Sequence, residues 1–287
     1  MHVATNGGTS AVLLGTGKVL VVGGCTLGHC PSVTTDAELY DPATGTWSTT
    51  GHTITSHGYA TITRLGSGKV LLAGGCSGRL CGSPNSTAEL YDPATGQWAA
   101  TGALTTEAGG VSPVHAAAVL LPSGQVLLAG GLNYYPTSQL YDPTTGTWHR
   151  TAPMGTPRES FTLTRLPSGA VLAAGGCDSY YCETILSSAE LFDPATGTWT
   201  PTGDMTHRRV YQTASLLLTG GVLVAGGTDT TGVATASAET YDPTSHSWSA
   251  TPSMHVARAA QTATTLTDGR VLVAGGASTT AEVFNTH

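Results

Sequence analysis

Short hydrophobic runs and tight turns alternate along the chain in a pattern that repeats about every fifty residues. In one unit, an alternating segment over residues 59–65 is followed by a Gly/Ser turn and by a second hydrophobic run over 69–75 that ends in two glycines. A third run over 88–91 precedes an Asp-Pro turn, and a fourth contains Trp98. Period-two alternation and short apolar runs are typical of strands. The pattern therefore predicts four short strands per unit and almost no helix.

The same residues mark six copies of this unit. Their Gly-Gly pairs begin at Gly23, Gly74, Gly130, Gly175, Gly226 and Gly275. Asp-Pro turns, each followed by a tryptophan, begin at Asp41, Asp92, Asp142, Asp193 and Asp242. Repeated four-stranded antiparallel units are typical of propellers, in which each sheet, or blade, packs against its neighbours. We therefore predict an all-β fold, a six-bladed β-propeller of four-stranded antiparallel blades.

A double glycine, a tyrosine and a tryptophan at a set spacing resemble the kelch repeat. In the second unit these residues are Gly74-Gly75, Tyr91 and Trp98, and the resemblance covers essentially the whole chain. The chain is thus similar to the kelch and galactose-oxidase central-domain superfamily, which implies a propeller fold. Kelch propellers include enzymes, lectin-like binders and scaffolds, so the resemblance implies no single activity.

The repeat runs from end to end without a linker and predicts one propeller domain over residues 1–287. Its units span approximately 6–50, 57–101, 113–151, 158–202, 209–251 and 258–287. In the last unit Asn285 replaces the turn aspartate and no tryptophan strand follows, so we expect the sixth blade to lack its outer strand. Residues 1–4 match residues 254–257. This match raises the hypothesis that the chain is a segment of a longer parent.

Charge and hydropathy narrow the classes of partner. The formal net charge is -7 and there is no run of Lys or Arg, which argues against nucleic-acid binding because that relies on neutralising phosphates. No apolar stretch approaches the ~20 residues needed to cross a bilayer, so we expect no membrane span.

All six cysteines occur in three loops that follow a glycine pair. In each loop two cysteines are separated by four residues, as Cys25 and Cys30, Cys76 and Cys81, and Cys177 and Cys182. Structural zinc usually needs four converging ligands, and these pairs lie in different units. The spacing therefore predicts one disulfide within each loop and no metal site. Three disulfides predict an oxidising location, which is extracellular, periplasmic or at the cell surface.

The two ends of each blade differ in the variability of their loops. The turns between strands one and two and between strands three and four are short and nearly identical, whereas the other loops vary and form the candidate site face. Alignment of the units places one residue of each at the same level of the innermost strand: Asn6, His57, Pro113, Arg158, Arg209 and Arg258. Two residues further on come Gly8, Tyr59, His115, Ser160, Tyr211 and Ala260.

These positions suggest a cup that is basic on one side and aromatic on the other. Arg158, Arg209 and Arg258 would bind a carboxylate through paired donors, while His57, Tyr59, His115 and Tyr211 would contact a sugar. The alternative is that each arginine holds a backbone carbonyl or a glutamate that recurs in strand three. These glutamates are Glu38, Glu89, Glu190, Glu239 and Glu282. Both alternatives stay open at this point.

Paired tyrosines mark two of the variable loops. Tyr134 and Tyr135 lie in the third unit, and Tyr180 and Tyr181 in the fourth. Exposed aromatic pairs on adjacent loops predict a surface for stacking, and the alternative is that they pack over the loop beneath them.

The sequence favours a binding or interaction module whose ligand, a glycan or a protein, lies on the variable face. One alternative is an enzyme resembling an epimerase or mutarotase that acts on a sugar or sugar acid in the channel, with Glu159 or Glu107 as its carboxylate. The resemblance also implies a copper-radical oxidase as an alternative, but that chemistry needs a cysteine-linked tyrosine, and no cysteine is free if each loop forms its predicted disulfide. A third alternative is a structural component that assembles through the open edge of blade six. We expect no cofactor.

Overall fold

Each main sheet consists of antiparallel strands that follow one another in chain order. The computed structural model describes residues 7–26, 32–105, 113–132, 136–178, 182–276 and 278–285. Six such sheets lie within these residues, together with one 3-10 turn at Arg79–Cys81. The predicted all-β fold and the predicted blades are therefore confirmed.

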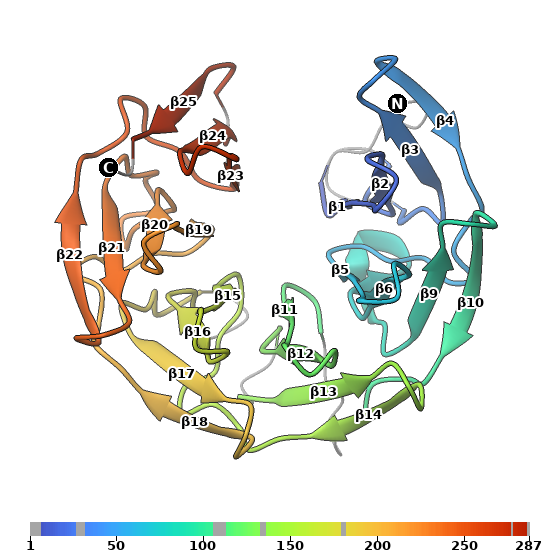
Figure 1. Cartoon of the computed structure of the whole chain (residues 1–287), viewed down its shortest axis with the longest axis horizontal. Coiled ribbons are helices and arrows are strands. Elements are labelled where there is room, and N and C mark those ends of the chain that lie inside the picture. Colours follow the sequence, from blue (N-terminus) through green and yellow to red (C-terminus); the bar gives the residue numbers. More distant parts are fainter. Residues whose placement is uncertain are drawn as a thin grey trace. The chain divides into compact units, whose positions relative to one another are not determined.

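The strands fall into two compact units, which are described separately. The first comprises Met1–Asn133 and Thr137–Thr151, and the second comprises Tyr134–Pro136 and Ala152–His287. The first unit contains three four-stranded sheets (Figure 1). Their strands are β1 (Ser10–Leu13), β2 (Val19–Val22), β3 (Ala37–Asp41) and β4 (Thr46–Thr49); β5 (Thr61–Arg64), β6 (Val70–Ala73), β9 (Ala88–Asp92) and β10 (Gln97–Thr101); and β11 (Ala117–Leu120), β12 (Val126–Ala129), β13 (Ser138–Asp142) and β14 (Thr147–Arg150). A short ribbon of β7 (Cys76–Ser77) and β8 (Ser83–Pro84) lies in the loop after β6.

The second unit contains two four-stranded sheets and one three-stranded sheet. Their strands are β15 (Thr162–Arg165), β16 (Val171–Ala174), β17 (Ala189–Asp193) and β18 (Thr198–Pro201); β19 (Thr213–Leu216), β20 (Val222–Ala225), β21 (Ala238–Asp242) and β22 (Ser247–Thr251); and β23 (Gln261–Thr265), β24 (Val271–Gly275) and β25 (Ala281–Phe284). Among the described residues the sixth sheet thus has no fourth strand, as the sequence predicts.

Neighbouring sheets of a unit pack side by side through their first strands. β5 contacts both β1 and β11 in the first unit, and β19 contacts both β15 and β23 in the second. The second strands β6, β12, β16 and β20 are buried at all four of their positions. A strand covered on both faces can carry apolar residues at every position, which explains the continuous hydrophobic runs before the glycine pairs.

The repeated aromatic residues fill the spaces between neighbouring sheets. Tyr91 and Trp98 have ring centroids 5.1 Å apart and belong to a buried cluster with Leu20 of the preceding sheet. The Trp98 Nε1–H also donates a 2.9 Å hydrogen bond to the carbonyl of Gly51, in the segment that connects the two sheets. The tyrosine and the tryptophan of the repeat therefore hold successive blades together.

The Asp-Pro turn closes through its own hydrogen bonds. In the second sheet the Asp92 carboxylate accepts the backbone N–H of Ala94 at 2.9 Å, and the N–H of Gly96 donates to the Asp92 carbonyl at 2.8 Å. Gly96 has a φ of 71°, in the left-handed region that favours glycine.

Within the described part of the chain, no helix is long and apolar enough to cross a membrane.

Candidate functional site

In each sheet, a residue one or two positions ahead of the first strand has a left-handed backbone. These residues, called the lead-in positions below, are Gly8, Tyr59, His115, Ser160, Tyr211 and Ala260, and their φ values lie between 51° and 66°. They are the second set that the sequence alignment places at one level. In the first compact unit (Met1–Asn133 and Thr137–Thr151) the N–H of Tyr59 donates to the carbonyl of Gly8 at 2.8 Å. In the second, Tyr211 donates to Ser160 at 3.2 Å and Ala260 donates to Tyr211 at 2.9 Å, so hydrogen bonds join consecutive lead-in positions.

Three of the lead-in positions carry an aromatic ring. Tyr59 and His115, both half-buried, have ring centroids 4.4 Å apart with an interplanar angle of 41°. The Tyr59 ring lies over Gly8, where a Cβ atom would approach it to 3.0 Å. Burial lowers the pKa of His115 to about 4, so its imidazole is neutral at neutral pH. In the second unit Tyr211 is 41% exposed.

The three predicted arginines are buried inside their own blades. The side chains of Arg158, Arg209 and Arg258 are 0% exposed, and each Nη2 forms an ion pair with the strand-three glutamate of its sheet. For Arg158 the partner is Glu190 at 3.0 Å, and its Nη1–H groups reach the carbonyls of Gly175 and Ser188 at 3.0 and 2.8 Å. The same set of contacts recurs around Arg209 and Arg258.

These contacts are those of the structural alternative, in which each arginine holds carbonyls and a repeated glutamate. Burial lowers the pKa of Arg158, and the Glu190 carboxylate opposes that shift. Burial alone would raise the pKa of Glu239, but backbone N–H donors and Arg209 outweigh it, so this pKa is lowered. A ligand-binding role for the three arginines stays a prediction, and it would require these blade-internal pairs to open first.

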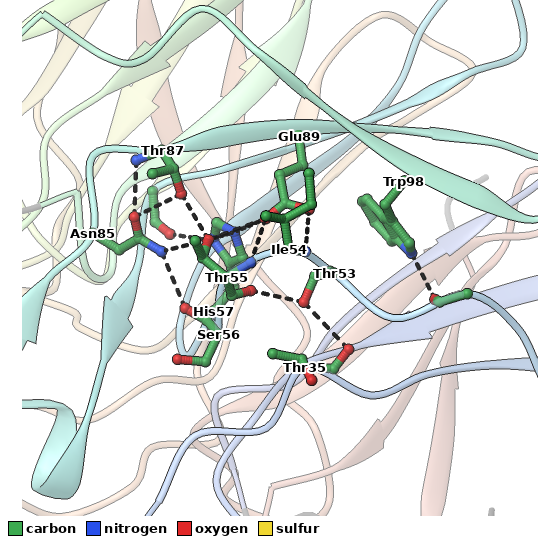
Figure 2. Close-up of polar contacts among 12 residues, drawn as sticks. Thr35, Thr53, Ile54, Thr55, Ser56, His57, Asn85, Thr87, Glu89 and Trp98 are labelled. Carbon is green, nitrogen blue, oxygen red and sulfur yellow. Dashed lines mark hydrogen bonds and ion pairs between the residues drawn. The ribbon is translucent and has the colours of Figure 1, made fainter.

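In the second blade a histidine takes the place of the arginine (Figure 2). The His57 side chain is buried, its Nδ1 lies 2.8 Å from the Gly74 carbonyl and its Nε2 lies 3.1 Å from Glu89 Oε1. The Glu89 carboxylate also accepts the backbone N–H groups of Ile54 and Thr55 at 2.8 and 2.9 Å. Burial alone would raise the pKa of Glu89. The hydrogen bonds from His57 and from the two backbone N–H groups outweigh burial, so the pKa is lowered. His57 therefore makes contacts of the same kind as the arginines, and its predicted role in ligand binding stays a prediction.

Two of the predicted disulfides lie in the described loops. Cys76 is bonded to Cys81 and Cys177 to Cys182. Cys25 is also disulfide-bonded, and its predicted partner Cys30 lies outside the described residues.

Each of these two disulfides is tied to the segment before a first strand. The backbones of Cys76 and Gly58 exchange hydrogen bonds of 2.8 and 2.9 Å, and those of Cys177 and Glu159 exchange bonds of 2.9 and 3.1 Å. The disulfide loop thus packs against the residue that directly precedes a lead-in position.

Glu159 lies against the disulfide of the fourth blade. Its side chain is buried, and Oε1 is 3.3 Å from the Cys177 sulfur and 3.4 Å from the Cys182 sulfur. Disulfide sulfurs carry no proton, so they cannot donate a hydrogen bond to this carboxyl, and Oε2 has no hydrogen-bond partner among the described residues. Burial raises the pKa of Glu159 to about 7. The three side chains converge as metal ligands would, but the bond between the sulfurs leaves no thiolate to bind a metal.

Sequence reasoning did not identify this contact. It named Glu159 as a carboxylate beside Arg158, whereas in the structure Arg158 pairs with Glu190 and Glu159 faces the sulfurs. The predicted stacking tyrosines Tyr134, Tyr135, Tyr180 and Tyr181 lie outside the described residues, as do Asn6 and Glu107.

Comparison with known proteins identifies a family model and similar solved structures. The family model described as Kelch motif matches residues 9–51, 66–100, 168–206 and 209–255. A solved structure described as "Novel fungal alcohol oxidase with catalytic diversity among the AA5 family, in complex with copper" has 20% sequence identity and a TM-score of 0.75. The match covers 93% of this chain and 57% of that one, so the chain spans a little over half of that protein's length. This likeness shows a common fold. A search of curated proteins found no match.

Proposed function

The chain belongs to the Kelch-motif family, and from this premise we propose that it is an extracellular binding module for a glycan, held by the aromatic lead-in residues. The observation that carries the proposal is the pair of half-buried rings of Tyr59 and His115 on a left-handed backbone. An L-residue in this region costs roughly 1–2 kcal/mol. Strained backbone of this kind is concentrated at functional sites.

The other lead-in positions show that the fold itself does not require a ring there. Gly8, Ser160 and Ala260 adopt the same backbone with small side chains. Tyr59, His115 and Tyr211 accept the same strain with large side chains that stay partly exposed. We infer that the rings are kept for their contact with a ligand.

The chemistry of the Tyr59–His115 pair suits a hydroxyl-rich ligand. Aromatic rings offer flat apolar faces, and the tyrosine hydroxyl can both donate and accept a hydrogen bond. A neutral imidazole also offers one donor and one acceptor, and the lowered pKa of His115 keeps it neutral at pH 7. The Cys76–Cys81 loop supports this pair through Gly58, the residue before Tyr59. A pre-ordered loop reduces the entropy lost on binding.

A glycan array followed by titration calorimetry on the best ligand tests the proposal. We expect Tyr59→Ala and His115→Ala each to weaken binding at least about ten-fold, since ring contacts of roughly 1.5 kcal/mol are lost. His149→Ala, on the exposed face of β14, is the matched control and should bind like the wild type. An array that binds nothing, or equal affinities for all variants, would overturn the proposal.

The residues present do not fit the copper that the similar structure contains. His57 is the histidine nearest in sequence to the lead-in residue Tyr59, and both of its ring nitrogens are already bonded within the blade. The described part of the chain has no free cysteine that could link to a tyrosine. We therefore propose no copper-dependent reaction for this chain. We also do not propose an enzyme that binds a sugar acid through the buried arginines.

A second candidate function, assembly through the edge of β25, is favoured by a pocket beside that strand. In other blades the tryptophan Nε1–H donates to the carbonyl of the connecting segment, as Trp148 does to Gly102 and Trp248 to Gly203. The residue equivalent to Gly203 before the sixth sheet is Pro252. It lines a pocket of about 210 Å³ together with residues that include Met254 and Phe284.

We propose that a tryptophan-bearing strand of a neighbouring subunit pairs with β25 and fills this pocket. A peptide with the sequence of residues 245–251, which includes Trp248, is the probe. We expect it to bind and to raise the melting temperature, whereas the same peptide with alanine in place of tryptophan should do neither. Equal behaviour of the two peptides would contradict this candidate.

A further inference from the structure

Within the described residues, the buried carboxyl of Glu159 has no hydrogen-bond donor, and it touches both sulfurs of a disulfide. Its Oε1 lies 3.3 and 3.4 Å from the two Sγ atoms, and Oε2 has no partner within the described residues. A buried polar group without a partner costs folding free energy and calls for an explanation. The contact would become favourable if the sulfurs were thiols, because each S–H could then donate to the carboxylate.

From this contact we propose that Cys177–Cys182 is a thiol–disulfide exchange centre, with Glu159 as its proton donor and acceptor and a small dithiol as its substrate. The two cysteines differ in the way that such a reaction needs. Cys177 is fully buried and packs with Ile185 and Val210, whereas Cys182 is only partly buried. An incoming thiolate therefore reaches the Cys182 sulfur, and Cys177 is the leaving group.

The reaction balances with a dithiol as the reductant. The substrate thiolate attacks Cys182 Sγ, the bond between the cysteines breaks, and its electron pair goes to Cys177 Sγ, which takes the proton from Glu159. The second thiolate of the substrate then attacks the substrate sulfur of the mixed disulfide and releases Cys182. The Cys182 thiolate and the Glu159 carboxylate then take up two protons from solvent, the same number that the two substrate thiols lost on ionising. The protein thus gains two electrons and two protons, and the substrate leaves as a cyclic disulfide. In the reverse direction the Glu159 carboxylate accepts the proton of Cys177.

The neighbouring charged groups are engaged elsewhere. Arg158 is paired with Glu190, Arg208 donates to the Ile185 carbonyl at 2.9 Å, and Asp178 accepts the backbone N–H of Thr184 at 3.2 Å. Ile185 and Val210 add no titratable group to the cluster around the disulfide. Within the described residues Glu159 is therefore the group placed to give a proton to the buried sulfur.

The second blade contains a natural control. Cys76–Cys81 has the same spacing and the same backbone bridge, but Gly58 stands where the fourth blade has Glu159. Both disulfides occur in one molecule, so one reaction measures both at the same reductant concentration. The fraction of substrate thiol that is ionised changes with pH, but it affects the reduction rates of both disulfides equally. The ratio of the two rates therefore does not depend on it.

The experiment treats the whole protein with dithiothreitol, traps free thiols by alkylation and follows each disulfide by peptide mass spectrometry. We expect Cys177–Cys182 to be reduced faster than Cys76–Cys81, by about ten-fold or more below pH 7, because a positioned general acid accelerates the step. The ratio should fall as pH rises through about 7, where Glu159 ionises. A ratio that does not change with pH in the wild type would overturn the proposal, and this arm needs no variant.

Two substitutions sharpen the result. Glu159→Gln should lower the ratio and remove its pH dependence, because an amide cannot transfer a proton. Gly58→Glu should accelerate reduction of Cys76–Cys81, although its Cβ would meet the two sulfurs at 3.2 and 3.3 Å and they must give way slightly. Unchanged rates in Glu159→Gln would show that the carboxyl takes no part.

Discussion

The second and fourth blades have the same frame and differ in three consecutive residues. Each has a disulfide in the loop after its second strand and a buried glutamate in its third strand. Before the first strand the second blade has His57, Gly58 and Tyr59, and the fourth has Arg158, Glu159 and Ser160.

The three positions do three different jobs. The first bonds the strand-three glutamate, the second packs on the disulfide, and the third is the lead-in position. A ring without a carboxyl in the second blade favours ligand contact, and a carboxyl without a ring in the fourth favours disulfide chemistry. The two blades thus present different side chains on one shared backbone.

The largest expected effect comes from removing the arginine at the first of these positions in the fourth blade, because this breaks its ion pair. Arg158→Ala leaves the buried Glu190 without its cation and should lower the free energy of unfolding by about 3–5 kcal/mol. Arg158→His, which installs the residue of the second blade, should cost less. Urea denaturation of both variants measures the difference, and a loss below about 1 kcal/mol for Arg158→Ala would contradict the buried pair.

The second position should make stability depend on pH in the fourth blade only. The pKa of Glu159 is about 7 in the folded protein and 4.5 in its ordinary state, so the folded protein holds the proton more tightly. The stability gained from this is complete below pH 4.5 and is lost as pH rises through about 7. At roughly 1.4 kcal/mol per pKa unit, the change is about 3 kcal/mol.

Urea denaturation of the wild type and Glu159→Gln at several pH values measures this change. We expect the wild type to lose stability relative to the variant between about pH 5 and about pH 8. A constant difference across this interval would show that Glu159 ionises as freely in the folded chain as in the unfolded one.

The strand-three glutamate of the second blade, Glu89, should change stability with pH in the opposite direction to Glu159. The pKa of Glu89 is lowered on folding: burial opposes this, but the bonds from His57, Ile54 and Thr55 outweigh burial. Its contribution is therefore complete above the ordinary pKa of 4.5 and is lost as pH falls below that value. Melting temperatures of the wild type and Glu89→Gln should converge in acid, and parallel curves would contradict the shift.

The smallest effect is expected at the lead-in positions. Ser160→Gly removes a left-handed L-residue with φ 51° and a buried hydroxyl that has no hydrogen-bond partner among the described residues. It should raise the free energy of unfolding by about 1 kcal/mol. Tyr59→Gly relieves the same strain but loses the His115 contact, so its gain should be smaller. Urea denaturation compares the two, and a larger gain for Tyr59→Gly would mean that the ring pair does not stabilise the fold.

The periodic sequence predicted most of the scaffold. The expected strands over 59–65 and 69–75 are β5 and β6, shorter at both ends, and the run over 88–91 is β9. Strand pairing follows from local period-two patterns and short turns, so neighbouring residues carry the information. The same is true of the disulfides, whose cysteines are five positions apart.

The candidate site was only partly predictable. Alignment of the repeats placed Arg158 and Tyr59 at the correct levels, because a repeat preserves backbone position. It did not give the direction of the side chains. Arg158 turns into its own blade because Glu190 and two carbonyls there compensate a buried charge, which solvent would otherwise have to do.

The sequence by itself determined the blades, their order and the cysteine pairs, since each depends on residues close together in the chain. Only the tertiary structure decided that Glu159 meets a disulfide 18 positions away and that Tyr59 meets His115 of the next blade. These contacts depend on how a first strand docks against a loop or a neighbouring sheet. That docking is set by the packing of buried strands such as β6 and β16, which every copy of the repeat shares, so the repeat carries no mark of the contact itself.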